Sequence, residues 1–250
     1  MFKNYLSIIS LFFIVLCSYA DVKQNKSLGH YNDAKYVKAF EWLKKATDQG
    51  DAKAQYSLGE CYYYGYGTKQ NYDRAFEWFK KAADQGHVEG EYALGLCYLY
   101  GYGVNENRIK AYEWYIKAAE HGDRKAQYNL GIYYNSKKEY KKSFSWYMKS
   151  AKQDLSEAQF NIACCYYNGI VVKQNYRKAF KWAQKAADQG DALAQFSLGE
   201  CYYYGDGVKQ NYSKALKWHQ KAADKGNMDA QKELQEYLDK YNNSFKSNNK

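Results

Sequence analysis

Five cysteines are the most reactive side chains beyond residue 20, and four of them directly precede a tyrosine. They are Cys61, Cys97, Cys164, Cys165 and Cys201, of which all but Cys164 have this neighbour. These four cysteines occupy the same position of a sequence repeat that is described below. Equivalent positions in neighbouring stacked helical repeats lie about 10 Å apart, whereas a disulfide needs Cα atoms within about 7 Å. A vicinal Cys164–Cys165 bridge would be possible but strained, and no C-x-x-C motif indicates redox or zinc chemistry. We therefore predict that the cysteines act as buried small hydrophobes.

The remaining candidates for catalysis or metal binding are four scattered histidines, His30, His87, His121 and His219. None has the i, i+4 spacing of a helical metal pair. His87 replaces a capping aspartate, and His121 lies at a predicted helix C-terminus, where a cation is favoured. Neither G-x-S-x-G nor H-E-x-x-H occurs, and the only S-x-x-K is in the tail. We predict no catalytic, cofactor-binding or metal-binding residues, and hence no enzyme.

The elements that position these side chains follow a repeat that the tryptophans mark. A phrase related to AFEWFKKAADQG recurs around each one, and the tryptophans are Trp42, Trp78, Trp114, Trp146, Trp182 and Trp218. Their successive spacings are 36, 36, 32, 36 and 36 residues. A period in this range indicates stacked supersecondary units in one solenoid domain.

The first half of the unit from Asp51 to Gly86 has the pattern of an amphipathic helix. Asp51 is a suitable N-cap, and one stripe at helical spacing holds Ala54, Leu58, Cys61 and Tyr62. The adjacent Gly59 costs about 1 kcal/mol relative to alanine in a helix. Because this glycine recurs at Gly95, Gly131 and Gly199, it is expected to permit close helix–helix approach.

The second half is a loop followed by a second helix. Gly65 and Gly67 suit a helix end and a tight turn. Asn71 is expected to cap the helix from Tyr72 to Gln85, whose buried stripe would be Ala75, Trp78, Phe79 and Ala82. Gly86 supplies the left-handed stop. Each unit is thus an antiparallel helix hairpin that must stack on its neighbours to bury both stripes.

The pattern A-x-x-x-L-G-x-x-Y-x-x-G-x-G, then A-x-x-W-x-x-K-A-A-x-x-G, resembles the Sel1-like repeat family, a branch of the tetratricopeptide superfamily. The match extends from Ala54 to Gly86, recurs from Leu198 to Gly226, and covers roughly Ser27 to Leu238. The resemblance implies an all-α, right-handed α-solenoid that acts as a protein–protein interaction scaffold and has no chemistry of its own.

The predicted organisation departs from the ideal repeat at a few places. The repeat around Trp146 lacks the G-x-G loop, and Val171 stands where the next repeat should have a loop glycine. We expect a signal peptide, a partial capping repeat, five hairpins with the third shortened, a capping helix and a disordered tail. Their bounds are 1–20, 21–50, 51–86, 87–122, 123–154, 155–190, 191–226, 227–241 and 242–250.

A second stripe on the first helix of each unit, opposite the buried one, is the candidate binding surface. In the tetratricopeptide superfamily this face lines the concave groove, and carry-over by register places an aromatic residue in every layer. The candidate residues are Tyr56, Glu60, Tyr63, Tyr92, Leu96, Tyr128, Phe160, Tyr167, Phe196, Glu200 and Tyr203. Aromatic residues are enriched at interfaces, so we predict a groove for a peptide or protein segment of unknown identity. The alternative is that these rings pack on the neighbouring repeat as additional core.

The N-terminus has the features of an export signal. Lys3 precedes an apolar run from Leu6 to Leu16, and small residues stand at 18 and 20, which favours cleavage before Asp21. The run is shorter than the roughly 20 residues of a membrane span, so no stable span is expected after cleavage. A retained anchor and lipidation of Cys17 are the alternatives. The predicted location is the periplasm or medium in a bacterium, and the secretory lumen in a eukaryote.

The net charge of +10 could suggest an anionic partner. The lysines, however, recur at fixed repeat positions, as expected for a solvated helix face, and the export signal argues against nucleic acid. Some secreted cysteine-rich relatives of the family are linked to penicillin binding and β-lactam hydrolysis. Here the cysteines occupy another repeat position, so a β-lactam hydrolase is kept only as the alternative function.

Overall fold

The computed structural model describes the backbone of residues 34–247 and the side chains up to Tyr237. The predicted signal peptide, Cys17 and the part of the predicted capping repeat before position 34 lie outside this range. Within it the chain forms helices and connecting turns, without strands. No helix in this range is long and apolar enough to cross a membrane.

The described chain divides after Trp114 into two compact units. Unit 1 contains α2 (Ala34–Thr47), α3 (Ala52–Tyr64), α4 (Tyr72–Asp84) and α5 (Val88–Tyr100), and α6 (Arg108–Glu120) spans the division. Unit 2 continues with α7 (Arg124–Ser136), α8 (Tyr140–Lys152), α9 (Ser156–Asn168), α10 (Tyr176–Asp188), α11 (Ala192–Tyr204), α12 (Tyr212–Asp224) and α13 (Met228–Ser247).

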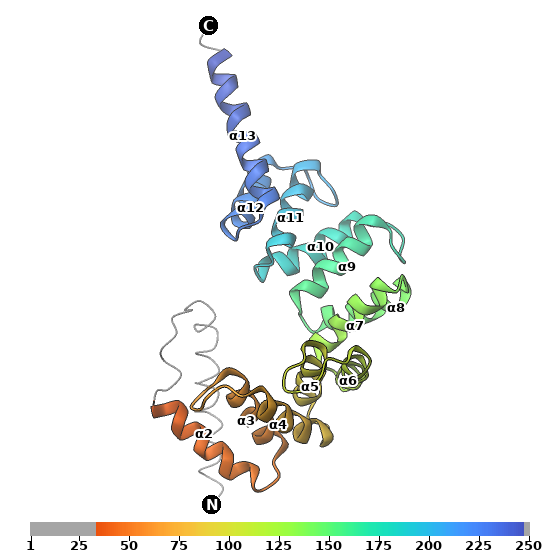
Figure 1. The fold of residues 1–250 in the computed structure, drawn as a ribbon. Coiled ribbons are helices and arrows are strands. Elements are labelled where there is room, and N and C mark those ends of the chain that lie inside the picture. The colour runs from red at the N-terminus through yellow and green to blue at the C-terminus, as the bar shows by residue number, and fades with distance from the viewer. Residues whose placement is uncertain (1–33, 248–250) are drawn as a thin grey trace, which may run out of the picture. The chain divides into compact units, whose positions relative to one another are not determined.

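Within each unit, successive helices pack against each other, as α3 packs on α4 and α4 on α5 (Figure 1). This is the arrangement of an all-α repeat solenoid, and it confirms the predicted fold class. Helix α13 continues to Ser247, past the residue where the sequence analysis ended the capping helix and into the segment expected as a disordered tail.

Side-chain caps start several helices as the sequence predicts, whereas Leu155 before α9 forms no side-chain cap. The Asp51 carboxylate accepts a hydrogen bond from the Ala54 backbone N–H at 2.6 Å, and Asn71 does the same for Arg74 at 2.9 Å. His87 replaces the aspartate, and its Nδ1 accepts from the Gly90 N–H at 3.2 Å. Burial lowers the pKa of His87, which favours the neutral ring that such an acceptor requires.

Gly59, Gly131 and Gly199, each on the first helix of its hairpin, permit close helix approach, as predicted. A Cβ atom at Gly59 would lie 2.6 Å from Cδ1 of Phe79, so the Phe79 ring lies directly on the α3 backbone. Tyr147 covers Gly131 in the same way, and His219 covers Gly199. In these three hairpins the residue after the tryptophan packs directly on the backbone of the first helix.

The second loop glycine joins one repeat to the previous one. Gly207 has φ +73°, and a Cβ there would collide with the carbonyl oxygen of Tyr176 at the start of α10. Val171 stands at the equivalent place with φ 67°. A β-branched residue in the left-handed region is strained, so this loop keeps its turn at a conformational cost.

The tryptophans are less buried than predicted. Leu58, Cys61, Tyr62, Ala75 and Phe79 form a core cluster in unit 1, whereas Trp78 packs on it only partly buried. Lys81 places its Nζ 4.0 Å from the centre of the Trp78 ring, and Lys149, Lys185 and Lys221 cover Trp146, Trp182 and Trp218 similarly. The indole thus lies at the edge of the core, where a lysine ammonium interacts with its face.

Glutamine side chains connect successive hairpins. Gln127, Gln159 and Gln195 each donate to a backbone carbonyl near the end of the preceding helix, at 3.0, 3.2 and 3.2 Å. Gln127 and Gln159 also accept a hydrogen bond from Gln153 and Gln189, at 2.9 and 2.8 Å. These links satisfy carbonyl groups at helix ends that otherwise lack partners.

Candidate functional site

The predicted binding residues lie on the first helix of each hairpin, on α3 and α5 in unit 1 and on α7, α9 and α11 in unit 2. All are half-buried except Tyr167, which is exposed. We call them together the candidate binding face. Because the rings are neither free nor enclosed, each can pack within the chain and also present an edge to a ligand.

In unit 1 the packing role is clear at Tyr56. Its ring stacks on His87 with 5.1 Å between ring centres and contacts Phe79 at 5.7 Å. Its hydroxyl donates to Oε1 of Glu60 at 2.9 Å. Burial, and then the Glu60 charge, raise the pKa of Tyr56. This tyrosine therefore contributes to core packing, the role that the alternative interpretation gave it.

Tyr63 belongs to a group of rings at the loop end of unit 1. It contacts Tyr64, Tyr72 and Tyr102 with ring centres 4.8, 5.3 and 5.3 Å apart. Tyr64 and Tyr72 are 40% and 37% exposed. The contacts of Tyr63 therefore connect the candidate binding face to the exposed rings of Tyr64 and Tyr72.

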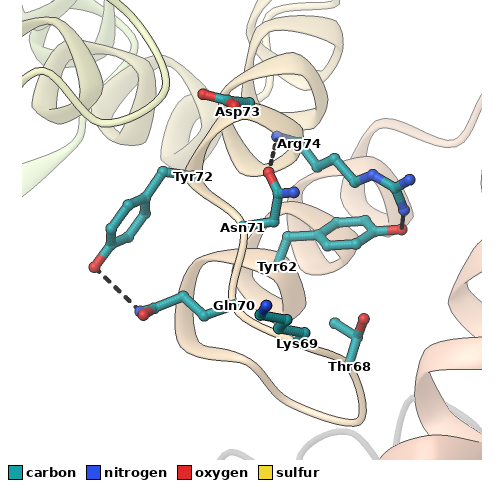
Figure 2. Close-up of a pocket in the computed structure, with 8 residues that line it drawn as sticks. All are labelled: Tyr62, Thr68, Lys69, Gln70, Asn71, Tyr72, Asp73 and Arg74. Atoms are coloured by element: carbon teal, nitrogen blue, oxygen red, sulfur yellow. Dashed lines mark hydrogen bonds between the residues drawn. The ribbon is translucent and has the colours of Figure 1, made fainter.

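An open pocket of about 420 Å³ lies beside this group, at the loop before α4 (Figure 2). Gln70 donates to the Tyr72 hydroxyl at 3.1 Å, and the Arg74 guanidinium donates to the Tyr62 hydroxyl at 3.2 Å. Its other lining residues are Thr68, Lys69, Asn71 and Asp73. No motif in the sequence indicates this pocket. Its lining is polar and contains no nucleophile paired with a base.

In unit 2 the predicted rings pack into two core clusters. Tyr128 contacts the Tyr147 ring at 5.7 Å, and burial raises its pKa. Phe160 packs against the cluster around Leu198. Tyr167 reaches further along the chain, because its hydroxyl donates to Oδ2 of Asp206 at 2.7 Å.

The C-terminal end of unit 2 brings together Phe196, Glu200 and Tyr203 on α11 with His219 on α12. His219 is 0% exposed, stacks on Phe196 at 5.2 Å, and has Nε2 3.2 Å from Oε1 of Glu200. Tyr203 contacts Tyr237 of α13 at 5.7 Å. Sequence reasoning treated His219 as one of several scattered histidines. The repeat register holds the missed signal, since His219 follows Trp218 as Phe79 follows Trp78.

Three of the thiols are buried as predicted, whereas Cys164 and Cys165 are only half-buried. Cys61, Cys97 and Cys201 are buried and form no disulfide. Burial raises the pKa of each of these three thiols to about 12. Nucleophilic and metal-binding chemistry requires the thiolate, which these sites disfavour. In the described part of the chain, no group of three or more His, Cys, Asp or Glu residues could hold a metal ion.

Comparisons with known proteins give a consistent result. The model of the Sel1 repeat matches residues 21–51, 52–87, 88–123, 124–155, 156–191 and 192–227. A solved structure of c5321, described as a protective antigen present in uropathogenic Escherichia coli strains displaying an SLR fold, is 36% identical with a TM-score of 0.72. That match covers 82% of this chain and 46% of the other, so this chain spans less than half of c5321.

Two further structures extend the comparison. A Sel1 repeat protein from Oxalobacter formigenes is 32% identical, with a TM-score of 0.73 over 82% of this chain and 83% of the other. The immunity protein Pa5087 from Pseudomonas aeruginosa is 19% identical, with a TM-score of 0.56 over 87% and 81% of the two chains, and supports the fold alone. No curated protein matches the sequence at a significant level.

Proposed function

The chain belongs to the Sel1 repeat family, and from this premise we propose that it is an exported, non-enzymatic scaffold that binds a protein or peptide segment through the candidate binding face. The repeat fold is consistent with a role in protein–protein interaction. The observation that supports this surface is the half-buried aromatic residue on the first helix of each hairpin, from Tyr56 and Tyr92 in unit 1 to Phe196 in unit 2. Such rings offer large contact area with few rotors.

The proposed location rests on the sequence of residues 1–20, which has the charge, apolar run and small residues of an export signal. Fractionation of cells that express the full chain tests it. Recovery of a chain beginning at Asp21 from the periplasm, medium or secretory lumen is the expected result. A full-length chain in the cytosol would contradict it.

Binding is tested with immobilised residues 21–250 and lysates of the source cell and of candidate hosts. The test variant is Tyr167→Ala with Tyr203→Ala, on the candidate binding face. The matched control is Tyr140→Ala with Leu216→Ala, two side chains that are 45% and 40% exposed on the second helices of unit 2. Far-UV circular dichroism verifies that each variant is folded.

We expect one or more protein partners that the control retains and the test variant loses. Partners that survive the test variant would refute binding at this face. Measurable nitrocefin turnover by the wild-type sample, without a protein partner, would instead favour a β-lactam hydrolase.

A further inference from the structure

Carboxylates and tyrosines gather at the C-terminal end of unit 2, and we call Glu200, Asp206, Glu233, Tyr204 and Tyr237 the acidic tyrosine cluster. The residues come from α11, from the loop after it and from α13. Glu200, before burial, is the largest cause of the raised pKa of Tyr204, and Glu233 and Asp206 add to it. Burial, then Tyr203, Glu233 and Glu200, raise the pKa of Tyr237. The carboxylates of Glu200 and Glu233 therefore place negative charge near the Tyr204 and Tyr237 hydroxyls.

A buried imidazole lies directly beneath this cluster without a hydrogen bond. Both ring nitrogens of the 0% exposed His219 lack a hydrogen-bond partner, although Nε2 points towards Glu200 Oε1 at 3.2 Å. The Tyr237 hydroxyl is also buried without a hydrogen bond. Buried polar groups of this kind are rare in folded proteins and call for an explanation.

The equivalent carboxylate in unit 1 differs in one respect. Glu60 accepts the Tyr56 hydroxyl at 2.9 Å, whereas Phe196 occupies the place of that tyrosine beside Glu200. Glu200 therefore lacks this donor, and its side chain is 31% exposed. A ligand in solvent can reach it.

The cluster also offers aromatic faces. Tyr204 is 63% exposed, and its ring centre lies 4.9 Å from that of Tyr203, which in turn contacts Tyr237 at 5.7 Å. Tyrosine faces attract cations, and carboxylates form strong charge-assisted hydrogen bonds with them. Both features favour the same kind of ligand, a positively charged nitrogen group.

We propose that the acidic tyrosine cluster binds a lysine or arginine side chain of the segment that the candidate binding face captures. This inference rests on the proposed function, and it adds the chemistry of the partner. Charge complementarity is local, because the whole chain carries a net charge of +10 and would repel a basic peptide elsewhere. An anionic partner such as a nucleic acid would be repelled at this place.

The direct test is isothermal titration calorimetry of residues 21–250 with N-acetylated hexalysine amide and hexaarginine amide, and with hexaglutamate for comparison. The test variants are Glu200→Gln and Tyr204→Ala, and Tyr204→Phe keeps the ring. The charge-matched control is Asp188→Asn, an exposed carboxylate on α10. Circular dichroism checks the fold, and Tyr204 is exposed enough that its truncation leaves the core intact.

We expect the two basic peptides to bind and hexaglutamate not to bind. Glu200→Gln should weaken the affinity for the basic peptides by about tenfold or more, as expected for the loss of a charge-assisted hydrogen bond. Tyr204→Ala should also weaken binding, whereas Tyr204→Phe and Asp188→Asn should not. Equal binding by the wild type and Glu200→Gln would overturn the inference, as would tighter binding of hexaglutamate. If light scattering showed a dimer that the Glu200→Gln substitution dissociates, the cluster would bind a second copy of this chain, and the inference would be wrong.

The same variants separate this inference from the proposed function. If the partner captured from lysate is lost with Tyr167→Ala and Tyr203→Ala but retained by Glu200→Gln, the scaffold function stands and cation recognition fails. If neither variant affects capture, the candidate binding face itself is refuted.

Discussion

Replacing Lys225 with glutamine is expected to stabilise unit 2. Lys225 occupies the repeat position of Gln153 and Gln189, which donate to the buried glutamines at 127 and 159. Lys225 instead donates to the Gly190 carbonyl at 2.7 Å, and Oε1 of Gln195 is left buried without a hydrogen bond. The last hairpin therefore lacks a link that the two preceding hairpins have.

The structure also indicates the size of the effect. Gln153 Nε2 lies 2.9 Å from both the Gly122 carbonyl and Gln127 Oε1, so a glutamine at 225 can keep the carbonyl bond and gain the amide one. An unsatisfied buried acceptor costs about 1–3 kcal/mol, whereas the exposed lysine bond is replaced in kind. We expect Lys225→Gln to add about 1–2 kcal/mol to the free energy of unfolding.

Urea denaturation followed by circular dichroism measures this change as a higher midpoint at an unchanged slope. In a domain of this size about 1 kcal/mol corresponds to a Tm increase of roughly 2–4 °C. The reciprocal variant Gln153→Lys should lose a similar amount, and Lys225→Met, which has no donor, should not gain stability. A neutral or destabilising Lys225→Gln, or equal gains with methionine, would refute the hydrogen-bond explanation.

Three other outcomes are expected. His219→Phe removes two buried nitrogens that lack hydrogen bonds and should raise the urea midpoint by the equivalent of about 1–3 kcal/mol; a lower midpoint would show that the imidazole is needed for packing. Val171→Gly relieves a β-branched residue at φ 67° and should raise the Tm through a gain of about 1–2 kcal/mol, whereas a lower Tm would mean that the valine side chain compensates its strain. Burial raises the thiol pKa of Cys61, Cys97 and Cys201 to about 12, so the folded chain retains protons that the unfolded chain releases near pH 9. Its stability should therefore be full below about pH 9 and fall as the pH rises towards 12; if Cys→Ala variants of all three show the same alkaline loss in urea titrations, the thiols are not its cause.

Sequence reasoning recovered the features that depend on neighbours along the chain. Capping by Asp51 and Asn71 involves a side chain and a backbone N–H three residues later, so residue type at one spacing is sufficient to predict it. The role of Gly59 could also be predicted, because the glycine recurs at one register and only a close contact compensates its helical cost. The period of the tryptophans then determined the fold class.

The exposure of the candidate binding face could not be predicted from the sequence. The register places Tyr56, Phe160 and Phe196 at the same position of the first helix, but it does not indicate how far the next hairpin covers each ring. That cover depends on partners about 20 to 30 residues away, such as Phe79 and His87 for Tyr56. The sequence therefore predicts which residues share a face of the helix, whereas the exposure of these residues depends on how neighbouring repeats pack.

By itself, the sequence determined the helix hairpins, their caps and their stacking, because these follow from residue type at short and repeated spacings. Tertiary structure alone placed the tryptophans at the edge of the core, linked Gln153 to Gln127 between the two helices of a hairpin, and buried His219 beside Glu200. The physical reason is that hydrogen bonding and burial between distant residues depend on how neighbouring helices approach one another. A local sequence pattern cannot specify the distance between helices that pack against each other.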